Sequence, residues 1–209
     1  MTRFAALTPA LIRRAEKELS AADAVMAKVI AARGPLRLRR EKEPPFHVLA
    51  VSIINQQLSQ KAADAIEKRV AAVIPSPFAA ADAMRASPLE LRAAGLSSGK
   101  VRYLRELADR VQSGAIPLAA FARMADEEII ASLVSCPGVG RWTAEMFLMF
   151  AMHRPDIVSG GDAALRRAAR ILYGKRFRGG DEEVLLKVAQ KWRPWRTVAS
   201  RYLWLSLAD

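Results

Sequence analysis

A glycine-rich turn within residues 133–146 carries side chains whose types and spacing could do chemistry. Its letters are L-V-S-C-P-G-V-G-R-W-T-A-E-M, between two helical apolar patterns. Glycines permit backbone conformations closed to other residues and leave main-chain amides uncovered. A helix start near Arg141 would offer free N–H groups and a partial positive charge, which together bind phosphate. Gly138, Val139, Gly140 and Arg141 therefore indicate either a clamp for a nucleic-acid backbone or an ordinary helix–helix turn.

A second candidate is Asp162, which ends the segment Asp156-Ile-Val-Ser-Gly-Gly-Asp162. Its place at the start of an expected helix is typical of an N-cap aspartate. A fixed carboxylate can also stabilise a positive charge that develops beside it, and it can orient or deprotonate water. Asp156 is the rival carboxylate, and we interpret it as structural.

Composition favours a nucleic-acid partner. The chain has 209 residues, 33 Lys+Arg against 21 Asp+Glu, a net charge of +12 and a pI near 10.5. Basic surfaces bind nucleic acids because phosphate contacts release counterions. The single cysteine, Cys136, excludes a disulfide within the chain and a four-cysteine zinc or iron–sulfur site. No signal peptide or membrane span is predicted, so we expect a cytoplasmic protein in contact with the nucleoid.

The elements that must position these residues all read as helices. Apolar residues recur at helical spacing in 8–31, 46–55, 59–74, 99–112 and 126–134. Ser87-Pro88-Leu89-Glu90 predicts a capped helix start, and Asp162 and Asp181 open further helices. No run alternates apolar and polar residues. The sequence therefore predicts an all-α fold, as one compact unit or two small lobes.

Three further stretches add a family resemblance to the turn. They are SIINQQLSQKAA (52–63), GLSSGKVRYL (95–104) and WRPWRTVASRYLW (192–204). With the turn, they resemble the helix-hairpin-helix (HhH-GPD) DNA glycosylase superfamily, in its 3-methyladenine DNA glycosylase II branch, over about residues 11–205. The resemblance implies a single glycosylase unit of two helical lobes with a cleft between them. The expected lobes are 50–142, with the hairpin at 135–141, and 1–49 plus 143–209, with no front β domain.

The resemblance also implies an activity. Asp162 matches the catalytic carboxylate of a monofunctional base-excision-repair enzyme, which removes flipped-out alkylated purines from double-stranded DNA and leaves an abasic site. Strand-cutting relatives have a lysine where this chain has Trp142, and tryptophan cannot form an imine. Many relatives have proline and a second acidic residue where this chain has Ser159-Gly160-Gly161, so we expect a looser loop before Asp162.

Pocket and wedge residues follow from the same motifs. Trp142, Trp204, Met146 and Phe46 match the base pocket, with core packing as the alternative, most strongly for Phe46. Gln57 and Leu58 match the segment that fills the space left by a flipped base, with a buried helix end as the alternative. Separately, we assign Trp192 and Trp195 to the core, and His47 and His153 to structural roles.

Cofactors and partners complete the prediction. No catalytic metal or other cofactor is expected, although family hairpins can hold a monovalent sodium or potassium ion on main-chain carbonyls, here those of Val134, Cys136 and Val139. We expect a monomer on damaged double-stranded DNA, with no membrane and no obligate protein partner. Two alternatives stay open: a glycosylase of this fold for uracil, hypoxanthine or an oxidised purine, and a non-catalytic DNA-binding module.

Overall fold

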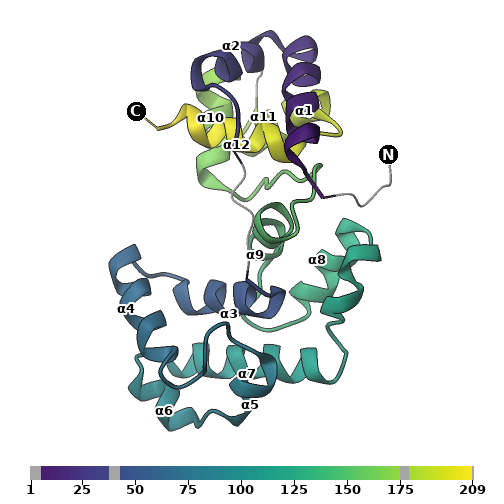
Figure 1. Ribbon diagram of the computed structural model, residues 1–209. Coiled ribbons are helices and arrows are strands. Elements are labelled where there is room, and N and C mark those ends of the chain that lie inside the picture. The colour runs from purple at the N-terminus through teal and green to yellow at the C-terminus, as the bar shows by residue number, and fades with distance from the viewer. Residues whose placement is uncertain (1–5, 38–42, 175–178, 209) are drawn as a thin grey trace. The chain divides into compact units, whose positions relative to one another are not determined.

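The computed structural model describes residues 6–37, 43–174 and 179–208. Within these ranges every regular element is a helix, which confirms the prediction of an all-α protein (Figure 1). In the same ranges, no helix is both long enough and apolar enough to cross a membrane. The chain divides into two compact units, one formed by Met1–Arg40 with Leu148–Asp209 and the other by Glu41–Phe147. Each unit is built around its own helices.

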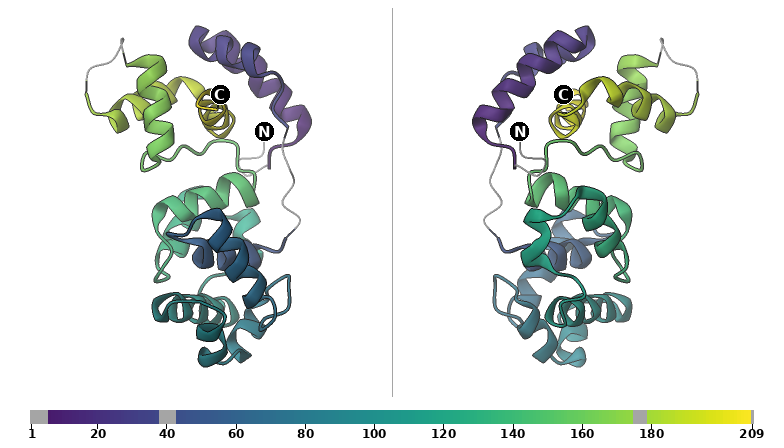
Figure 2. Two further views of the ribbon diagram at one scale, coloured as in Figure 1. Left: turned by 90° about the vertical axis from the view of Figure 1, so that its left-hand side faces the viewer. Right: turned by 90° about the vertical axis from the view of Figure 1, so that its right-hand side faces the viewer.

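In its described residues, the unit formed by the two ends of the chain has five α-helices. They are α1 (Pro9–Ala22), α2 (Ala24–Arg33), α10 (Ala163–Tyr173), α11 (Asp181–Ala189) and α12 (Arg196–Ser206). Both side views show α12 between α10 and the α1–α2 pair (Figure 2). A short 3-10 turn, Gln190–Trp192, links α11 to the segment before α12. Trp192 and Trp195 are 0% and 1% exposed, so both lie in the core as predicted.

Residues 8–31 form two helices where the apolar pattern predicted one. Asp23 leaves the helical conformation at φ −145°, and its Oδ1 accepts from the amides of Val25 and Met26 at the start of α2. Its Oδ2 accepts from Tyr173 Oη at 2.9 Å and from Trp192 Nε1 at 3.1 Å. The break therefore places one carboxylate where it caps a helix and satisfies two buried donors.

Over residues 43–147, the described part of the central unit, the chain forms seven α-helices and a 3-10 turn. They are α3 (Pro45–Asn55), α4 (Gln60–Val70), α5 (Ala80–Arg85), α6 (Pro88–Ala93), α7 (Ser98–Gln112), the turn η1 (Leu118–Arg123), α8 (Asp126–Val134) and α9 (Arg141–Met146). The long helix α7 packs against α3 and α5, and α8 packs against α9 (Figure 1). The sequence did not predict α5 or the turn at Leu118. The predicted lobe boundary at 50 would divide α3, whereas the structure keeps α3 within one unit.

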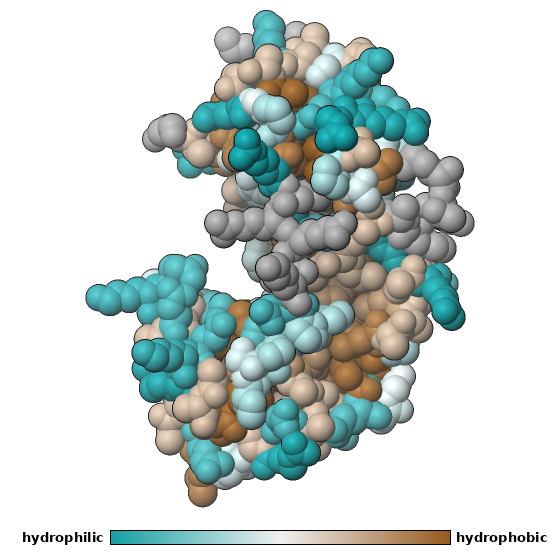
Figure 3. Space-filling model, viewed as in Figure 1, coloured by the Kyte–Doolittle hydropathy of each residue, from teal (hydrophilic) through white to brown (hydrophobic). Residues whose placement is uncertain are grey.

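Local capping signals determine several helix ends. Ser87 Oγ accepts from Leu89 N at 3.2 Å, and Glu90 Oε2 accepts from Ser87 N at 3.2 Å, so the predicted capping box forms. Helix α4 is strongly amphipathic, and its visible face carries mainly hydrophilic side chains (Figure 3). Capping side chains therefore fix where the helices begin, and the apolar face of each helix determines how it packs against its neighbours.

Candidate active site

The predicted hairpin joins α8 to α9 within the central unit. Gly138 has φ +89°, and a Cβ there would lie 2.5 Å from Cγ of Tyr103. Gly140 has φ −85° and ψ 168°, an extended conformation that any residue adopts. Its missing side chain leaves open space, with no atom within 4 Å of the Cβ position. The prediction of a backbone conformation that requires glycine is therefore confirmed at Gly138. At Gly140, the absence of a side chain instead leaves the main chain at the start of α9 accessible.

The hairpin amides differ in what they can offer a phosphate. Val139 N donates to Cys136 O at 3.1 Å and closes the turn, so this amide is already used, contrary to its assignment to a phosphate clamp. Amides of the first turn of a helix have no intrahelical acceptor. Gly140, the N-cap of α9, contributes no side-chain cap to that turn. Any phosphate contact of the hairpin therefore concentrates on Gly140 and the start of α9.

Arg141 is engaged by two carboxylates, which the sequence did not predict. Its guanidinium contacts Glu127 at 2.7 and 3.1 Å and Glu145 Oε1 at 2.9 Å. These contacts, led by the hydrogen bonds with Glu127, raise the pKa of Arg141. The pairing offsets the charge that Arg141 would bring to a phosphate, so an anion at this turn would be held mainly by main-chain amides.

Beside the hairpin, the central unit contains a hollow of about 830 Å³. Among its lining residues are three that the sequence assigned to the pocket or the wedge: Trp142, Met146 and Gln57. Trp142 is 50% exposed, so it is not a core tryptophan. Phe46 is 5% exposed and is not among the lining residues, so the structure places it in the core rather than the pocket. Leu58 follows Gln57 and is half-buried.

One face of α3 supplies a second wall of this hollow, which the sequence did not predict. His47, Val48, Val51, Ser52 and Asn55 all line it. Their spacing of three and four residues marks one helical face, and this signal could have identified them. His47 Nδ1 accepts from Phe78 N at 3.0 Å, so His47 has the predicted structural role while also lining the hollow.

Asp162 belongs to the other unit, where it caps α10. Its Oδ1 accepts from Leu165 N at 2.7 Å and from Trp204 Nε1 at 3.1 Å. The residue is 9% exposed. The N-cap interpretation is thus confirmed, and the structure also brings together Asp162 and Trp204, two residues that the sequence assigned to catalysis and to the pocket. Because two donors hold one oxygen, the orientation of the carboxylate is restricted.

Trp204 stacks on Phe150, and Arg201 in turn lies over the Phe150 ring. Its ring lies 5.6 Å from the ring of Phe150 at an interplanar angle of 30°, and the Arg201 guanidinium carbon lies 4.5 Å from the centre of the Phe150 ring. Burial lowers the pKa of Arg201 to about 10. Phe150 is 38% exposed, and no sequence signal distinguished it from the apolar run around it. The stack holds the indole that bonds to Asp162.

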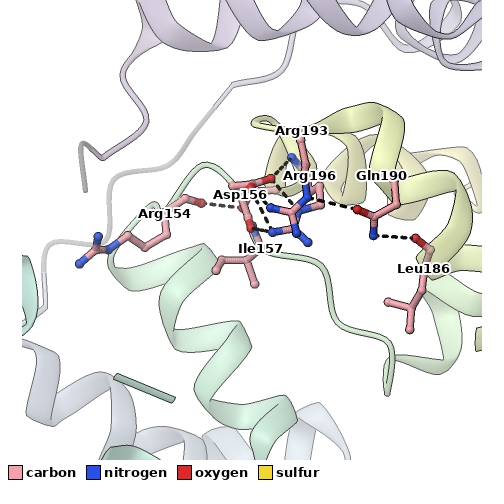
Figure 4. A network of polar contacts seen from close by, with 8 residues as sticks. Arg154, Asp156, Ile157, Leu186, Gln190, Arg193 and Arg196 are labelled. Carbon is pink, nitrogen blue, oxygen red and sulfur yellow. Dashed lines mark hydrogen bonds and ion pairs between the residues drawn. The ribbon is translucent and has the colours of Figure 1, made fainter. Parts of the chain in front are cut away.

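Asp156 is the centre of an ion-pair network in the same unit (Figure 4). Arg196 contacts its two oxygens at 2.6 and 3.0 Å, and Arg193 Nη1 lies 3.2 Å from Oδ2. Arg196 also donates to the Asp156 main-chain oxygen at 2.7 Å. A carboxylate bound by two guanidinium groups ties the loop to the start of α12, in agreement with the structural role assigned to it.

The loop before Asp162 is more tightly held than its glycines predicted. Ser159 is fully buried, and its carbonyl accepts from Asp162 N at 3.2 Å. A Cβ at Gly160 would lie 2.8 Å from Oε1 of Glu182, so the backbone passes close to that side chain. The expected looseness is therefore wrong at Gly160, where the missing side chain permits close packing.

A scan against family models finds a match over residues 50–194 to "HhH-GPD superfamily base excision DNA repair protein". The chain belongs to the HhH-GPD superfamily. The match spans the hairpin, Asp162 and Asp156, so these three features lie inside the region that defines the family.

Two solved structures are similar to this chain over nearly its whole length. A DNA-3-methyladenine glycosidase from Bacillus halodurans is 35% identical, with a TM-score of 0.87 over 93% of this chain and 89% of that one. A Schizosaccharomyces pombe 3-methyladenine DNA glycosylase, in complex with abasic DNA, is 32% identical, with a TM-score of 0.79 over 94% and 98%. By sequence, DNA-3-methyladenine glycosylase 1 of S. pombe is 33% identical over 95% of this chain and 90% of its own length.

Cys136 in the HhH-GPD hairpin should resist thiol reagents. It is 1% exposed, and burial raises its pKa to about 11. Since the thiolate is the reactive form, we expect alkylation by iodoacetamide at pH 8 to be slower than that of an unfolded control by about a hundredfold or more. Mass spectrometry over time would measure this rate. Equal labelling of native and urea-unfolded protein would contradict the buried position.

Proposed function

We propose that this protein is a monofunctional DNA glycosylase of base excision repair that hydrolyses the N-glycosidic bond of alkylated purines and leaves an abasic site. The observation that carries the proposal is Asp162, whose carboxylate is held by the first turn of α10 and by the indole of Trp204. The names of the relatives give the substrate class, and the abasic DNA bound to one of them is the expected product.

The proposed chemistry needs one fixed negative charge. As the bond between base and sugar breaks, the sugar resembles an oxocarbenium ion, and the Asp162 carboxylate stabilises its positive charge. The same carboxylate can orient or deprotonate the water that completes hydrolysis. A 3-methyladenine or 7-methylguanine base already carries positive charge, so it leaves as a neutral molecule with little help from a general acid. No catalytic metal is required by this sequence of steps.

Other residues serve binding. Gly140 and the start of α9 would hold a phosphate through main-chain amides, which fixes the position of DNA without reading its sequence. Trp142 offers an exposed aromatic face, on which an electron-poor alkylated base stacks well. With Met146 beside it, the hollow suits a cationic purine. A sodium or potassium ion on the carbonyls of Val134, Cys136 and Val139 would be structural.

Trp142 also limits the reaction. It occupies the hairpin position at which strand-cutting relatives have a lysine, and its indole cannot attack the sugar to form an imine. We therefore propose that the enzyme has no lyase activity. Among the alternatives, uracil, hypoxanthine and oxidised purines are neutral bases, and for these the charge argument for departure without an acid does not hold.

Base release from methylated DNA tests the function. We expect the protein to release 3-methyladenine and 7-methylguanine, measured by chromatography of the free bases. The strand should stay intact until alkali is added, and borohydride should trap no covalent protein–DNA adduct. Duplexes with single uracil, hypoxanthine or 8-oxoguanine lesions form the comparison set. Release of none of these bases, with DNA binding retained, would instead support a non-catalytic binding module.

A further inference from the structure

Lys100 makes two main-chain contacts at the end of α3. Its Nζ lies 2.7 Å from Ile54 O and 2.7 Å from Gln56 O, and it reaches them from the first turn of α7. Carbonyls at a helix C-terminus lack intrahelical donors and carry partial negative charge, so an ammonium group there satisfies and stabilises them. Burial lowers the pKa of this lysine. Lys100 is therefore an internal cap for α3, in contrast to a solvated surface lysine.

Gln56 connects this capped end to the hairpin. Its Nε2 donates to Gly138 O at 2.7 Å, across a sequence separation of 82 residues. Lys100 thus bonds to the main-chain oxygen of Gln56, and the hairpin carbonyl of Gly138 bonds to the Gln56 side chain. The next residue, Gln57, has φ +57°, a left-handed conformation that is uncommon for non-glycine residues. Such a conformation persists only where surrounding contacts fix it.

We propose that Lys100 is a positioning residue that fixes Gln57 and Leu58 relative to the phosphate-binding hairpin, acting through Gln56. The inference rests on the proposed function, because it assigns to Gln57 and Leu58 the filling of the space that a flipped base leaves. Gln57 is exposed and Leu58 is half-buried, so both can contact a ligand. Flipping costs unstacking energy, which a filling side chain offsets only if it enters at the correct register.

The first test compares two substrates that differ in the cost of flipping. One is a duplex with 7-methylguanine paired to cytosine, and the other has the same lesion in an unpaired bulge, where little stacking must be broken. For Lys100→Met, which keeps chain length but removes both hydrogen bonds, we expect single-turnover base release to fall about tenfold or more on the paired lesion. On the bulged lesion we expect less than about a threefold loss.

Matched variants make this test specific. Lys68→Met, at an exposed lysine of α4, should equal wild type on both substrates. Lys100→Arg retains a charged donor and should recover most of the paired activity. Gln56→Met removes the hydrogen bond to Gly138 and should reproduce the substrate-selective loss, which keeps the test valid if Lys100→Met does not fold. Equal losses on the two substrates, or no loss on either, would overturn the proposal.

A double-mutant cycle tests whether Lys100 acts through the loop. In a Leu58→Ala background, adding Lys100→Met should reduce release from the paired lesion little further, because the element that Lys100 positions is already lost. Full additivity of the two losses would overturn the assignment. These outcomes differ from failure of the proposed function, in which the wild-type protein would release base from neither substrate.

Discussion

Replacing Asp162 by asparagine should slow base release from methylated DNA by about a hundred- to a thousandfold. Asparagine is as good an N-cap as aspartate, so the hydrogen bond from Leu165 N can be kept. The change therefore removes the negative charge while retaining the helix start. Single-turnover release of 7-methylguanine would measure the effect, and binding to an abasic-site duplex should change far less.

The controls for this variant are two other aspartates. Asp64→Asn, at an exposed position of α4, should leave release unchanged. Asp156→Asn should act mainly on stability, because it weakens the ion pairs with Arg193 and Arg196. If Asp162→Asn releases base as fast as wild type, Asp162 is not the catalytic carboxylate. If Asp162→Asn lowers the melting temperature as much as Asp156→Asn does, its slower base release would instead be an effect on folding.

Replacing Gly138 by alanine should destabilise the central unit by roughly 3 kcal/mol. Two causes combine: the residue must stay at φ +89°, which disfavours a side chain, and its Cβ would lie 2.5 Å from the Tyr103 ring. The ring would have to move, and with it the helix α7 on which it stands. Chemical denaturation would measure the free energy, and the melting temperature should fall by roughly 10 °C.

Gly140→Ala is the matched control in the same turn. Its φ of −85° suits alanine and its Cβ meets no atom within 4 Å, so stability should change by less than about 0.5 kcal/mol. The added methyl would stand beside the open amides, so binding to undamaged duplex DNA should weaken. Equal destabilisation by the two variants would contradict the geometry of the hairpin. Unchanged DNA binding in Gly140→Ala would remove this turn from the phosphate contacts.

Features that depend on near neighbours in the chain could be predicted from the sequence. The all-α class, the Ser87 cap and the Asp162 cap follow from spacing and from side chains that bond to amides three residues away. The glycine turn and the assignment of Trp192 and Trp195 to the core also held. Helix breaks were less predictable: Asp23 divides 8–31 because its carboxylate satisfies Tyr173 and Trp192, which lie 150 and 169 residues further on.

Only the tertiary structure decided how the charges and aromatic rings of the site are used. Sequence identified Arg141 and Asp156 as charged groups. Glu145, one partner of Arg141, lies four residues away, but its other partner, Glu127, lies 14 residues away. The arginines that pair with Asp156 lie 37 and 40 residues away. Sequence identified Trp204 but not Phe150, whose stacking depends on the approach of α12 to the segment after α9. Local preferences act over a few residues, whereas contacts between distant side chains depend on how the helices pack. Residue types and their spacing therefore predicted the candidate site residues, and the tertiary structure decided which of them contact one another.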